Sequence, residues 1–351
     1  MRGGLPPAEP PPSNADVHDD AGPARPPTPS SRPGPPPSSS RPRPPPSWQE
    51  AFVEARDGTR LYVRTRETPG SSLTFLLCDG IACDGFIWRY LVDDLLPLGS
   101  IVHWNYRGHG RSAAPVDRDL VDIHAFVDDL SAVRAAHVSG PVVLMGHSMG
   151  CQLALEGYRH QPDGIAGLVL ICGTSGHLTH TFKGGDGLAR ALPRLIERVR
   201  RKPRLARALW SNVPPEVSVR VALAAGEVDA DAIQPEDLRR YSEHVAGLDL
   251  EMFLRMLHAI GEQTAEDMLG TIGVPTLVLA GEHDTFTPTY LAERMAAAIP
   301  GSELTIYPGA THVVPIERRE EVRDRLRDFV HQRVLPELEE TPRRAKNTQS
   351  P

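Results

Sequence analysis

Apolar and polar residues follow two different periods along this chain. Residues 48–67 alternate apolar and polar side chains around Asp57-Gly58, a dipeptide typical of tight hairpins, so two antiparallel strands are expected. Six later apolar runs are short and continuous, as in strands buried on both faces: 73–78, 100–106, 141–146, 167–172, 276–281 and 303–308. Helical spacing separates them at 86–98, 120–137, 149–160, 289–300 and 317–334. The alternation predicts an α/β fold, a mostly parallel twisted sheet with helices on both faces and antiparallel N-terminal strands.

One interval, between Gly173 and Ile272, contains helical patterns and no convincing strand. We expect a helical cap there, over approximately residues 174–271, inserted at the C-terminal edge of the sheet. Residues 183–207 hold nine Lys/Arg against two Asp/Glu, and residues 226–251 hold eight Asp/Glu against two Arg. The two halves are expected to face each other. A basic membrane-binding helix is the weaker alternative, because Pro193 and Pro203 interrupt the basic segment.

Both ends of the chain differ from the middle. The first 46 residues hold 17 of the chain's 35 prolines and no apolar periodicity, so residues 1–47 are predicted to be a disordered Pro-rich tail. Residues 337–351 are expected to form a second, flexible tail. The folded domain is therefore predicted to span residues 48–336. The PxxP-like steps of residues 1–47 leave open that this first tail is a ligand for an aromatic groove.

Composition excludes several classes of protein. The chain has 351 residues, is 40 % hydrophobic and carries a formal net charge of -7, which suits a globular enzyme better than a nucleic-acid-binding protein. It contains neither a signal-peptide-like N-terminus nor an apolar run of the roughly 20 residues that span a bilayer. A cytoplasmic location without obligate membrane association is the expectation. Buried free thiols are expected for the four cysteines, and no histidine cluster has metal-ligand spacing, so neither metal nor cofactor is predicted.

The chemistry begins at MGHSMG, residues 145–150, a GxSxG between an apolar run and a helical pattern. In this context the serine occupies a tight, strained turn that lifts its hydroxyl above the sheet edge. We predict Ser148 as a nucleophile. A serine needs a base to remove its proton, and the base needs an acid that fixes its tautomer. Asp284 and His312 follow the last two predicted strands and are the candidate acid and base.

The chain order Ser148, Asp284, His312 and the placement of each residue after a strand resemble the α/β-hydrolase superfamily. The resemblance covers roughly residues 49–335 and is most specific at GHSMG, GEHDTFTP and GATHVVP. It implies a lidded serine hydrolase of the esterase or lipase type. It also implies an oxyanion hole formed by two backbone N–H groups, those of Met149 and Ile81, with Gly80 supplying an unusual backbone conformation.

Relatives usually begin this loop with His-Gly, whereas this chain has Asp79-Gly80. A carboxylate there must be paired or point away from a developing oxyanion. We expect Asp79 to accept hydrogen bonds from loop amides, His147 or Arg107, so that Asp79→Asn keeps much of the activity. Asp84, before the 86–98 pattern, is expected to cap a helix rather than bind a metal.

Three histidines near these motifs are assigned structural or solvent roles. His109 lies in the glycine-rich YRGHGRS turn, and His147 and His283 adjoin the candidate catalytic residues.

The predicted reaction is hydrolysis of small to medium lipophilic carboxylic esters, a small-molecule substrate class, through an acyl-enzyme. A cofactor-free perhydrolase or haloperoxidase-like activity, thioester or C–C hydrolysis, and a non-catalytic receptor or scaffold role remain alternatives, since the fold does not choose between them. The oligomeric state stays open. Apolar residues near the expected mouth are the candidate substrate pocket: Phe86, Trp88, Phe182, Trp210, Phe253, Met256 and Phe286.

Overall fold

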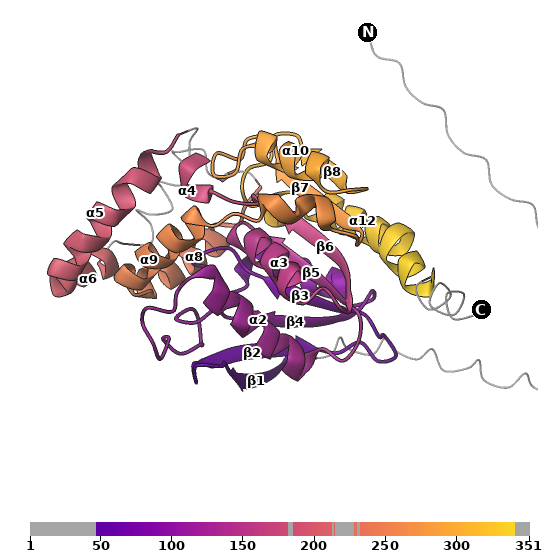
Figure 1. The fold of residues 1–351 in the computed structure, drawn as a ribbon, viewed down its shortest axis with the longest axis horizontal. Helices are drawn as coiled ribbons and strands as arrows, with labels where there is room; N and C mark the ends of the chain where they lie inside the picture. Colours follow the sequence, from indigo (N-terminus) through magenta and orange to yellow (C-terminus); the bar gives the residue numbers. More distant parts are fainter. Residues whose placement is uncertain (1–46, 182–184, 213, 215–227, 230–231, 341–351) are drawn as a thin grey trace, which may run out of the picture. The chain divides into compact units, whose positions relative to one another are not determined.

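The computed structural model describes residues 47–181, 185–212, 214, 228–229 and 232–340 (Figure 1). The Pro-rich segment up to residue 46, the last eleven residues and Phe182 fall outside these ranges. Residues 337–340, assigned to the flexible C-terminal tail, are helical, and Leu338 packs against the hydrophobic core, so that boundary is wrong. For residues 1–46 and 341–351 the interpretation as tails stays a prediction.

Eight strands form one sheet in the order β1-β2-β4-β3-β5-β6-β7-β8. The first two strands and the β2–β4 pair are antiparallel, and the other neighbours are parallel, as the apolar pattern predicts. The strands are β1 Gln49–Glu54, β2 Arg60–Arg66, β3 Thr74–Cys78, β4 Ser100–Trp104, β5 Val142–His147, β6 Ile165–Ile171, β7 Thr276–Gly281 and β8 Glu303–Tyr307.

Alternate residues of the central strands enter two separate hydrophobic clusters, one on each face of the sheet. Leu76 of β3 packs in the cluster that contains Phe126 of α2 and Leu153 of α3. Its neighbour Leu77 packs in the cluster that contains Leu91 and Leu326. Because side chains along a strand point to opposite faces in turn, strands covered on both sides must be apolar throughout.

The helices follow the predicted spacing with one exception. Those that cover the sheet are α2 Ile123–His137, α3 Met149–His160, α10 Thr289–Ala298, α11 Val314–Glu317, α12 Arg319–Phe329 and the π-helical turn η4 Val330–Val334. The single helix predicted over 86–98 is wrong. Two short pieces replace it, η1 Phe86–Trp88 and α1 Val92–Leu95.

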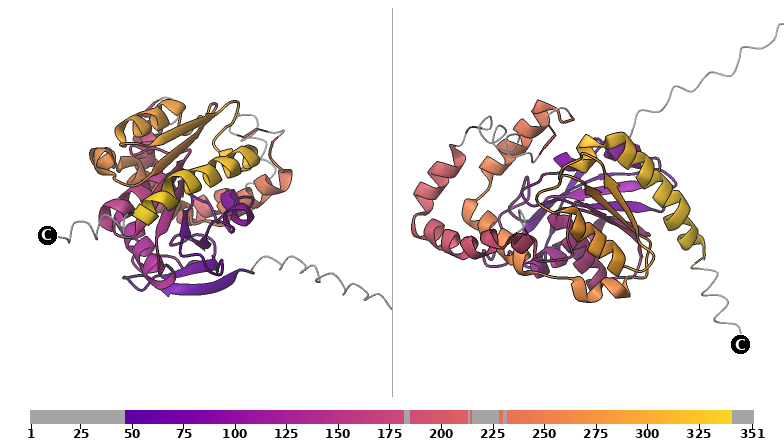
Figure 2. Two further views of the ribbon diagram at one scale, coloured as in Figure 1. Left: turned by 90° about the vertical axis from the view of Figure 1, so that its right-hand side faces the viewer. Right: turned by 90° about the horizontal axis from the view of Figure 1, so that it is seen from above.

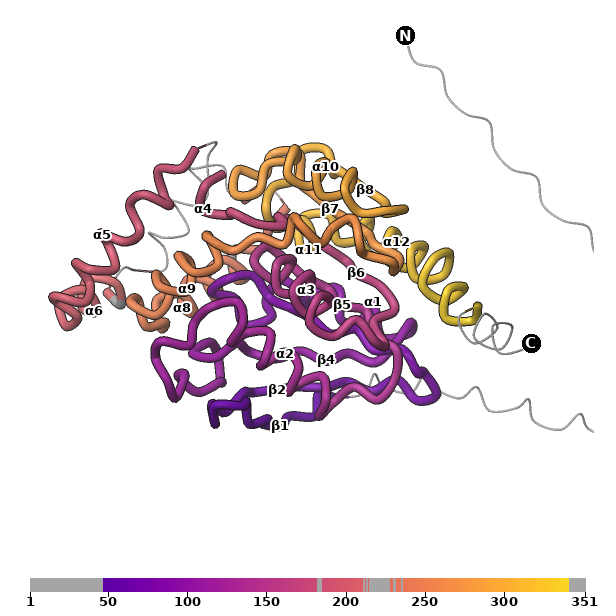
Figure 3. The backbone as a smooth tube through the Cα atoms, viewed as in Figure 1, coloured from indigo at the N-terminus to yellow at the C-terminus, as the bar shows by residue number. Residues whose placement is uncertain are grey.

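The interval between β6 and β7 is helical in its described part. It contains α4 Leu178–Thr181, α5 Gly187–Arg201, α6 Pro203–Ser211, α8 Pro235–Gly247, α9 Leu250–Glu262 and the 3₁₀ helix η3 Glu266–Thr271. Helices α5, α6, α8 and α9 gather beyond one end of the strands (Figures 1 and 2). Figure 3 traces how the backbone leaves the sheet after β6 and returns at β7.

Charges of the two halves of this segment do meet. Arg200 of α5 lies 3.1 Å from Glu251 of α9, and Arg207 of α6 lies 3.8 Å from Asp249. The prediction that Pro193 interrupts the basic segment is wrong, since α5 continues through it. Pro203 stands in the first turn of α6, where its missing N–H costs no helical hydrogen bond.

Two further findings concern the described part of the chain. None of its helices combines the length and apolarity needed to cross a membrane, and none of its clusters of His, Cys, Asp and Glu side chains could hold a metal ion. The four cysteines are free and buried.

Candidate active site

Ser148 occupies the turn between β5 and α3 in a strained conformation, with φ 53° and ψ -119°. Its neighbours in GxSxG must be glycines. A Cβ on Gly146 would lie 2.3 Å from the carbonyl oxygen of Gly150, and a Cβ on Gly150 would lie 2.1 Å from that of Cys78. These approaches are far shorter than van der Waals contact, so the two glycines permit the turn that holds Ser148 at the end of β5.

His312 and Asp284 form a hydrogen-bonded pair, with His312 Nδ1 2.8 Å from Asp284 Oδ2. Asp284 Oδ1 accepts from the backbone N–H groups of Phe286 and Thr287 at 2.8 and 2.9 Å, and Oδ2 also accepts from Thr287 Oγ1 at 2.7 Å. Burial alone would raise the pKa of Asp284. The charge of His312 and these hydrogen bonds overcome it and lower the pKa below its ordinary value. The carboxylate is therefore ionised and fixed in orientation.

The three residues follow the carboxyl ends of parallel strands β5, β7 and β8, which meet at one edge of the sheet. His147 links the loops. Its Nε2 donates to the carbonyl oxygen of His312 at 2.9 Å, and the two rings lie 5.0 Å apart. The residue that precedes Ser148 thus holds the backbone of His312 beside the Ser148 turn, a supporting position of the kind expected for His147. His283, by contrast, is exposed.

Two buried histidines should make folding stability depend on pH. Burial and the neighbouring His312 lower the pKa of His147 to about 3, and burial with the nearby His244 lowers the pKa of His109 to about 4. The unfolded chain binds these protons below about pH 6.5, whereas the folded chain does not. Stability should therefore be complete above that pH and fall as the pH drops. By pH 5 each group should cost on the order of 2 kcal/mol.

Urea unfolding at pH 7, 6 and 5 measures this fall. A His109→Asn variant, which cannot titrate at that position, should show a fall that is smaller by on the order of 2 kcal/mol. Equal unfolding free energies of the unmodified protein at pH 7 and pH 5 would contradict the assignment.

The loop after β3 approaches Ser148 closely, but its geometry differs from the prediction for Gly80. The residue with positive φ is Ala82, at 60°, and Gly80 has no such conformation. Gly80 is needed for space instead, because a Cβ there would lie 3.0 Å from His147 Nδ1 and 3.2 Å from Ser148 Cβ. The following residue, Ile81, is partly buried and packs against the hydrophobic core.

Asp79 has partners other than those expected. Its Oδ1 accepts from Trp88 Nε1 at 2.6 Å, and its Oδ2 lies 2.9 Å from His103 Nε2. The prediction of His147 or Arg107 as donors is wrong. Arg107 instead donates to Asp129 of α2 at 2.6 and 2.8 Å.

Asp84 does not cap a helix. The N-cap of η1 is Gly85, in a left-handed conformation, without a side-chain cap. Asp84 Oδ2 lies 3.2 Å from Arg240 of α8. The same helix supplies the fully buried Asp237, which pairs with Arg89 and accepts a hydrogen bond of 2.9 Å from Tyr90. Asp84 thus belongs to the contact between α8 and the segment that follows the Asp79 loop.

The predicted pocket residues are distributed over several surroundings. Phe286 lies against His312, with ring centroids 4.9 Å apart. Trp88 is fully buried, and its indole N–H donates to Asp79. Phe86 packs on Tyr241 of α8, with ring centroids 4.9 Å apart. Trp210 and Phe253 stack on each other within the helical segment, and Met256 is buried in the main core. Of these six residues, Phe286 is the one whose ring lies against His312.

Glu317 supports the His312 loop and was not predicted. Its carboxylate accepts from Thr311 N at 2.7 Å and Thr311 Oγ1 at 2.6 Å, directly before His312, and from Asp229 N at 2.8 Å. Glu317 is buried. The signal in the sequence that could have pointed to Glu317 is an acidic residue five positions after the candidate catalytic histidine.

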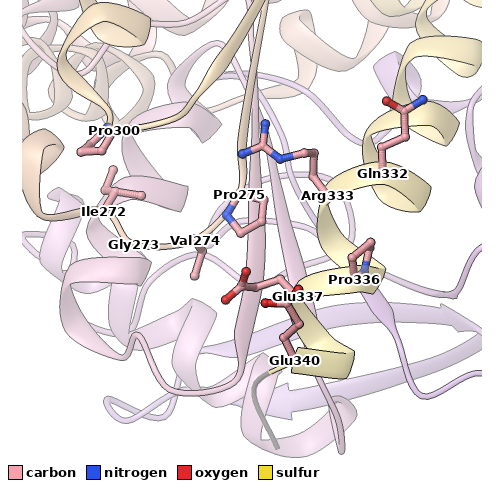
Figure 4. A pocket seen from close by; sticks show the side chains of 10 residues that line it. All are labelled: Ile272, Gly273, Val274, Pro275, Pro300, Gln332, Arg333, Pro336, Glu337 and Glu340. Atoms are coloured by element: carbon pink, nitrogen blue, oxygen red, sulfur yellow. The ribbon is translucent and has the colours of Figure 1, made fainter. Parts of the chain in front are cut away.

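A pocket of about 310 Å³ lies at the other end of the sheet. Val274 and Pro275 line it where β7 begins, opposite to the end of β7 that leads to Asp284 (Figure 4). Pro300, Arg333, Glu337 and Glu340 surround it, and none of the candidate site residues does.

Comparisons with known proteins agree with this architecture. The model of the family described as "Alpha/beta hydrolase family" matches residues 68–325. "Putative carbamate hydrolase RutD" from Rhizobium rhizogenes is 26 % identical over 263 residues, which are 74 % of this chain and 93 % of that protein. The esterase EaEST from Exiguobacterium antarcticum superposes with a TM-score of 0.64 at 23 % identity, covering 81 % of this chain and 100 % of the esterase. A bromoperoxidase from Bacillus anthracis has a TM-score of 0.65 at 20 % identity, with 81 % and 100 % covered. At these identities the two structures bear on the fold alone.

Proposed function

Because the chain belongs to the alpha/beta hydrolase family and is therefore a hydrolase, we propose that it cleaves carboxylic esters through an acyl-enzyme on Ser148. The observation that carries the proposal is the pair of His312 and Asp284, 2.8 Å apart, at the sheet edge where Ser148 holds a strained turn. A nucleophile, a base and an acid that orients the base are the parts that acyl transfer requires.

In the proposed mechanism His312 Nε2 removes the proton of Ser148 Oγ as the hydroxyl attacks the ester carbonyl. Asp284 Oδ2 accepts the Nδ1 proton of His312, which fixes the tautomer and stabilises the imidazolium. The N–H groups of Ile81 and Met149 hold the oxyanion. His312 then protonates the leaving alcohol, and water hydrolyses the acyl-enzyme by the same path.

The proposed substrates are small to medium lipophilic esters. Phe286 offers an apolar ring beside His312. Helices α4, α5, α6, α8 and α9 would serve as the lid over this edge. Apolar surface at the mouth favours an apolar acyl or alcohol group, because its burial is worth about 25 cal/mol for each Å².

A series of p-nitrophenyl esters from acetate to palmitate should show one maximum of kcat/KM at a short or medium acyl chain. Each methylene that the pocket buries should raise kcat/KM until the pocket is full, at about 0.8 kcal/mol per methylene. The measurement is initial rate against chain length, with a fluorophosphonate probe to count active serines.

The same assay separates the competing reactions. A phenyl carbamate and an acyl thioester are added as matched substrates, and bromide oxidation with acetate and peroxide tests perhydrolysis. Probe labelling with turnover of one of these, but of no simple ester, would replace the ester proposal. Absence of both labelling and turnover would instead favour a small-molecule receptor.

A further inference from the structure

Asp79, His103 and Arg64 form a hydrogen-bonded chain beneath the loop that carries Ile81. Asp79 Oδ2 lies 2.9 Å from His103 Nε2, and His103 Nδ1 accepts from Arg64 Nε at 3.0 Å. Asp79 and His103 are buried, whereas Arg64 is partly exposed and lies over the ring of Trp48. Arg64 and His103 stand directly opposite each other in the antiparallel register of β2 and β4.

The direction of every hydrogen bond in this chain is determined. A guanidinium can only donate, so His103 Nδ1 is the acceptor and the neutral ring carries its proton on Nε2. That proton points at Asp79 Oδ2. The other oxygen faces Trp88 Nε1, which is also a donor only. Both oxygens of Asp79 thus meet donors that cannot reverse, so both act as acceptors.

The hydrogen-bonded chain also supplies Arg64 as a positive charge for the Asp79 carboxylate. A buried carboxylate without a cation is costly, and a cation in direct contact would have to enter the crowded loop. Arg64 stays outside, two hydrogen bonds away. Space inside is limited, because a Cβ on Gly85 would lie 2.5 Å from Arg64 Nη2 and 2.6 Å from His103 Nε2.

The loop backbone is held at the same point. Tyr106 donates its hydroxyl proton to the carbonyl oxygen of Asp79 at 2.7 Å. The side chain and the carbonyl group of Asp79 are therefore both fixed. The backbone continues from Asp79 into Gly80, which lies close to the Ser148 turn, and then into Ile81.

We propose that His103 and Arg64 are positioning residues that act through Asp79: they hold its carboxylate in the core, away from the oxyanion, and thereby aim the Ile81 N–H at the reacting carbonyl. The inference rests on the proposed serine hydrolase function. It assigns a role in ester cleavage to two residues on β2 and β4 that do not touch the substrate.

The test exchanges donor and acceptor along the hydrogen bonds that join Asp79, His103 and Arg64. The expectation that Asp79→Asn keeps much of the activity assumed other partners than Trp88 and His103. With these partners the variant places an amide N–H against a donor, so kcat should fall about 10- to 100-fold with little change in KM. That loss is less than the roughly 100- to 1,000-fold loss that follows removal of an oxyanion donor. Arg64→Gln supplies a side chain that can accept. In the double variant His103 can protonate Nδ1, donate to the glutamine and accept from the asparagine. The double variant should therefore be more active than Asp79→Asn alone.

Arg60→Gln is the matched control, because Arg60 lies on the same strand and contacts the ring of Phe52 instead. Its kcat should equal that of the unmodified protein. Additive losses in the double variant would overturn the proposal, as would an Asp79→Asn variant with unchanged kcat.

A readout independent of turnover is the ¹⁵N NMR spectrum of the His103 ring. The unmodified protein should show the Nε2–H tautomer and the double variant the Nδ1–H tautomer. An Nδ1–H tautomer in the unmodified protein would overturn the proposal, even if Asp79→Asn fails to fold. Should Ser148→Ala retain ester turnover, the proposed function fails, while the tautomer still tests the chain of hydrogen bonds.

Discussion

Replacement of Ser148 by alanine should lower kcat for the preferred ester about a millionfold, the loss typical of a missing nucleophile in a serine triad. Without Oγ no acyl-enzyme forms, and the oxyanion donors alone leave a small residual rate over water. Alanine removes one oxygen and no backbone hydrogen bond, since the amide of Ser148 still donates to Ile171. The variant should therefore fold normally. The measurement is kcat by stopped assay at high enzyme concentration, together with fluorophosphonate labelling.

Ser131→Ala is a suitable control. Ser131 lies on α2 and donates to the carbonyl oxygen of Val127, away from the candidate site. This variant should keep full turnover and full labelling. Labelling of Ser148→Ala at the rate of the unmodified protein would show that another residue is the nucleophile.

Replacement of Asp284 by asparagine should lower kcat about 10⁴-fold while leaving the fold intact. Oδ1 of Asp284 accepts two backbone N–H groups, so an asparagine keeps its oxygen there and turns its N–H₂ toward His312. His312 Nδ1 must then accept, and its Nε2 carries the proton. A ring in that tautomer cannot accept the proton of Ser148, so the base is lost although every side chain stays in place.

Glu282→Gln is the matched control, because Glu282 is exposed and lies two residues before Asp284. Its activity should be normal. A loss smaller than 10-fold in Asp284→Asn would contradict the assignment of Asp284 as the acid and would direct attention to another carboxylate. Thermal unfolding curves of both variants show whether stability has changed.

Local patterns predicted the sheet and its helical insertion well. Continuous apolar runs give buried strands because the helices cover both faces. Of the GxSxG glycines, Gly146 avoids a clash with Gly150 in the same turn, whereas Gly150 avoids one with Cys78 of the neighbouring strand β3. The 86–98 pattern failed as one helix because Gly85, just before it, has a left-handed conformation and the backbone forms two short helices, whose apolar residues pack in the same core cluster.

The partners of Asp79 were beyond the reach of local patterns. His103 lies beside Asp79 through the pairing of β4 with β3, and Arg64 reaches His103 through the register of β2 against β4, strands separated by more than thirty residues in the chain. Trp88 was assigned to the pocket from its size and position, yet its indole N–H is needed inside the protein by Asp79. Side-chain direction depends on such pairings, and neither composition nor spacing contains them.

The carboxylate of Glu317 has a consequence for engineering by cap exchange. It binds Asp229, in the segment between β6 and β7, and Thr311, beside His312. Helices transplanted from a relative would bring their own selectivity, but they would leave this carboxylate without one of its donors unless the graft also presents a backbone N–H at the same point. The boundary of an exchangeable segment is therefore set by the Glu317 carboxylate, which both parts share. A chimera that preserves its hydrogen bonds should keep the His312 loop independent of which relative supplies the helices.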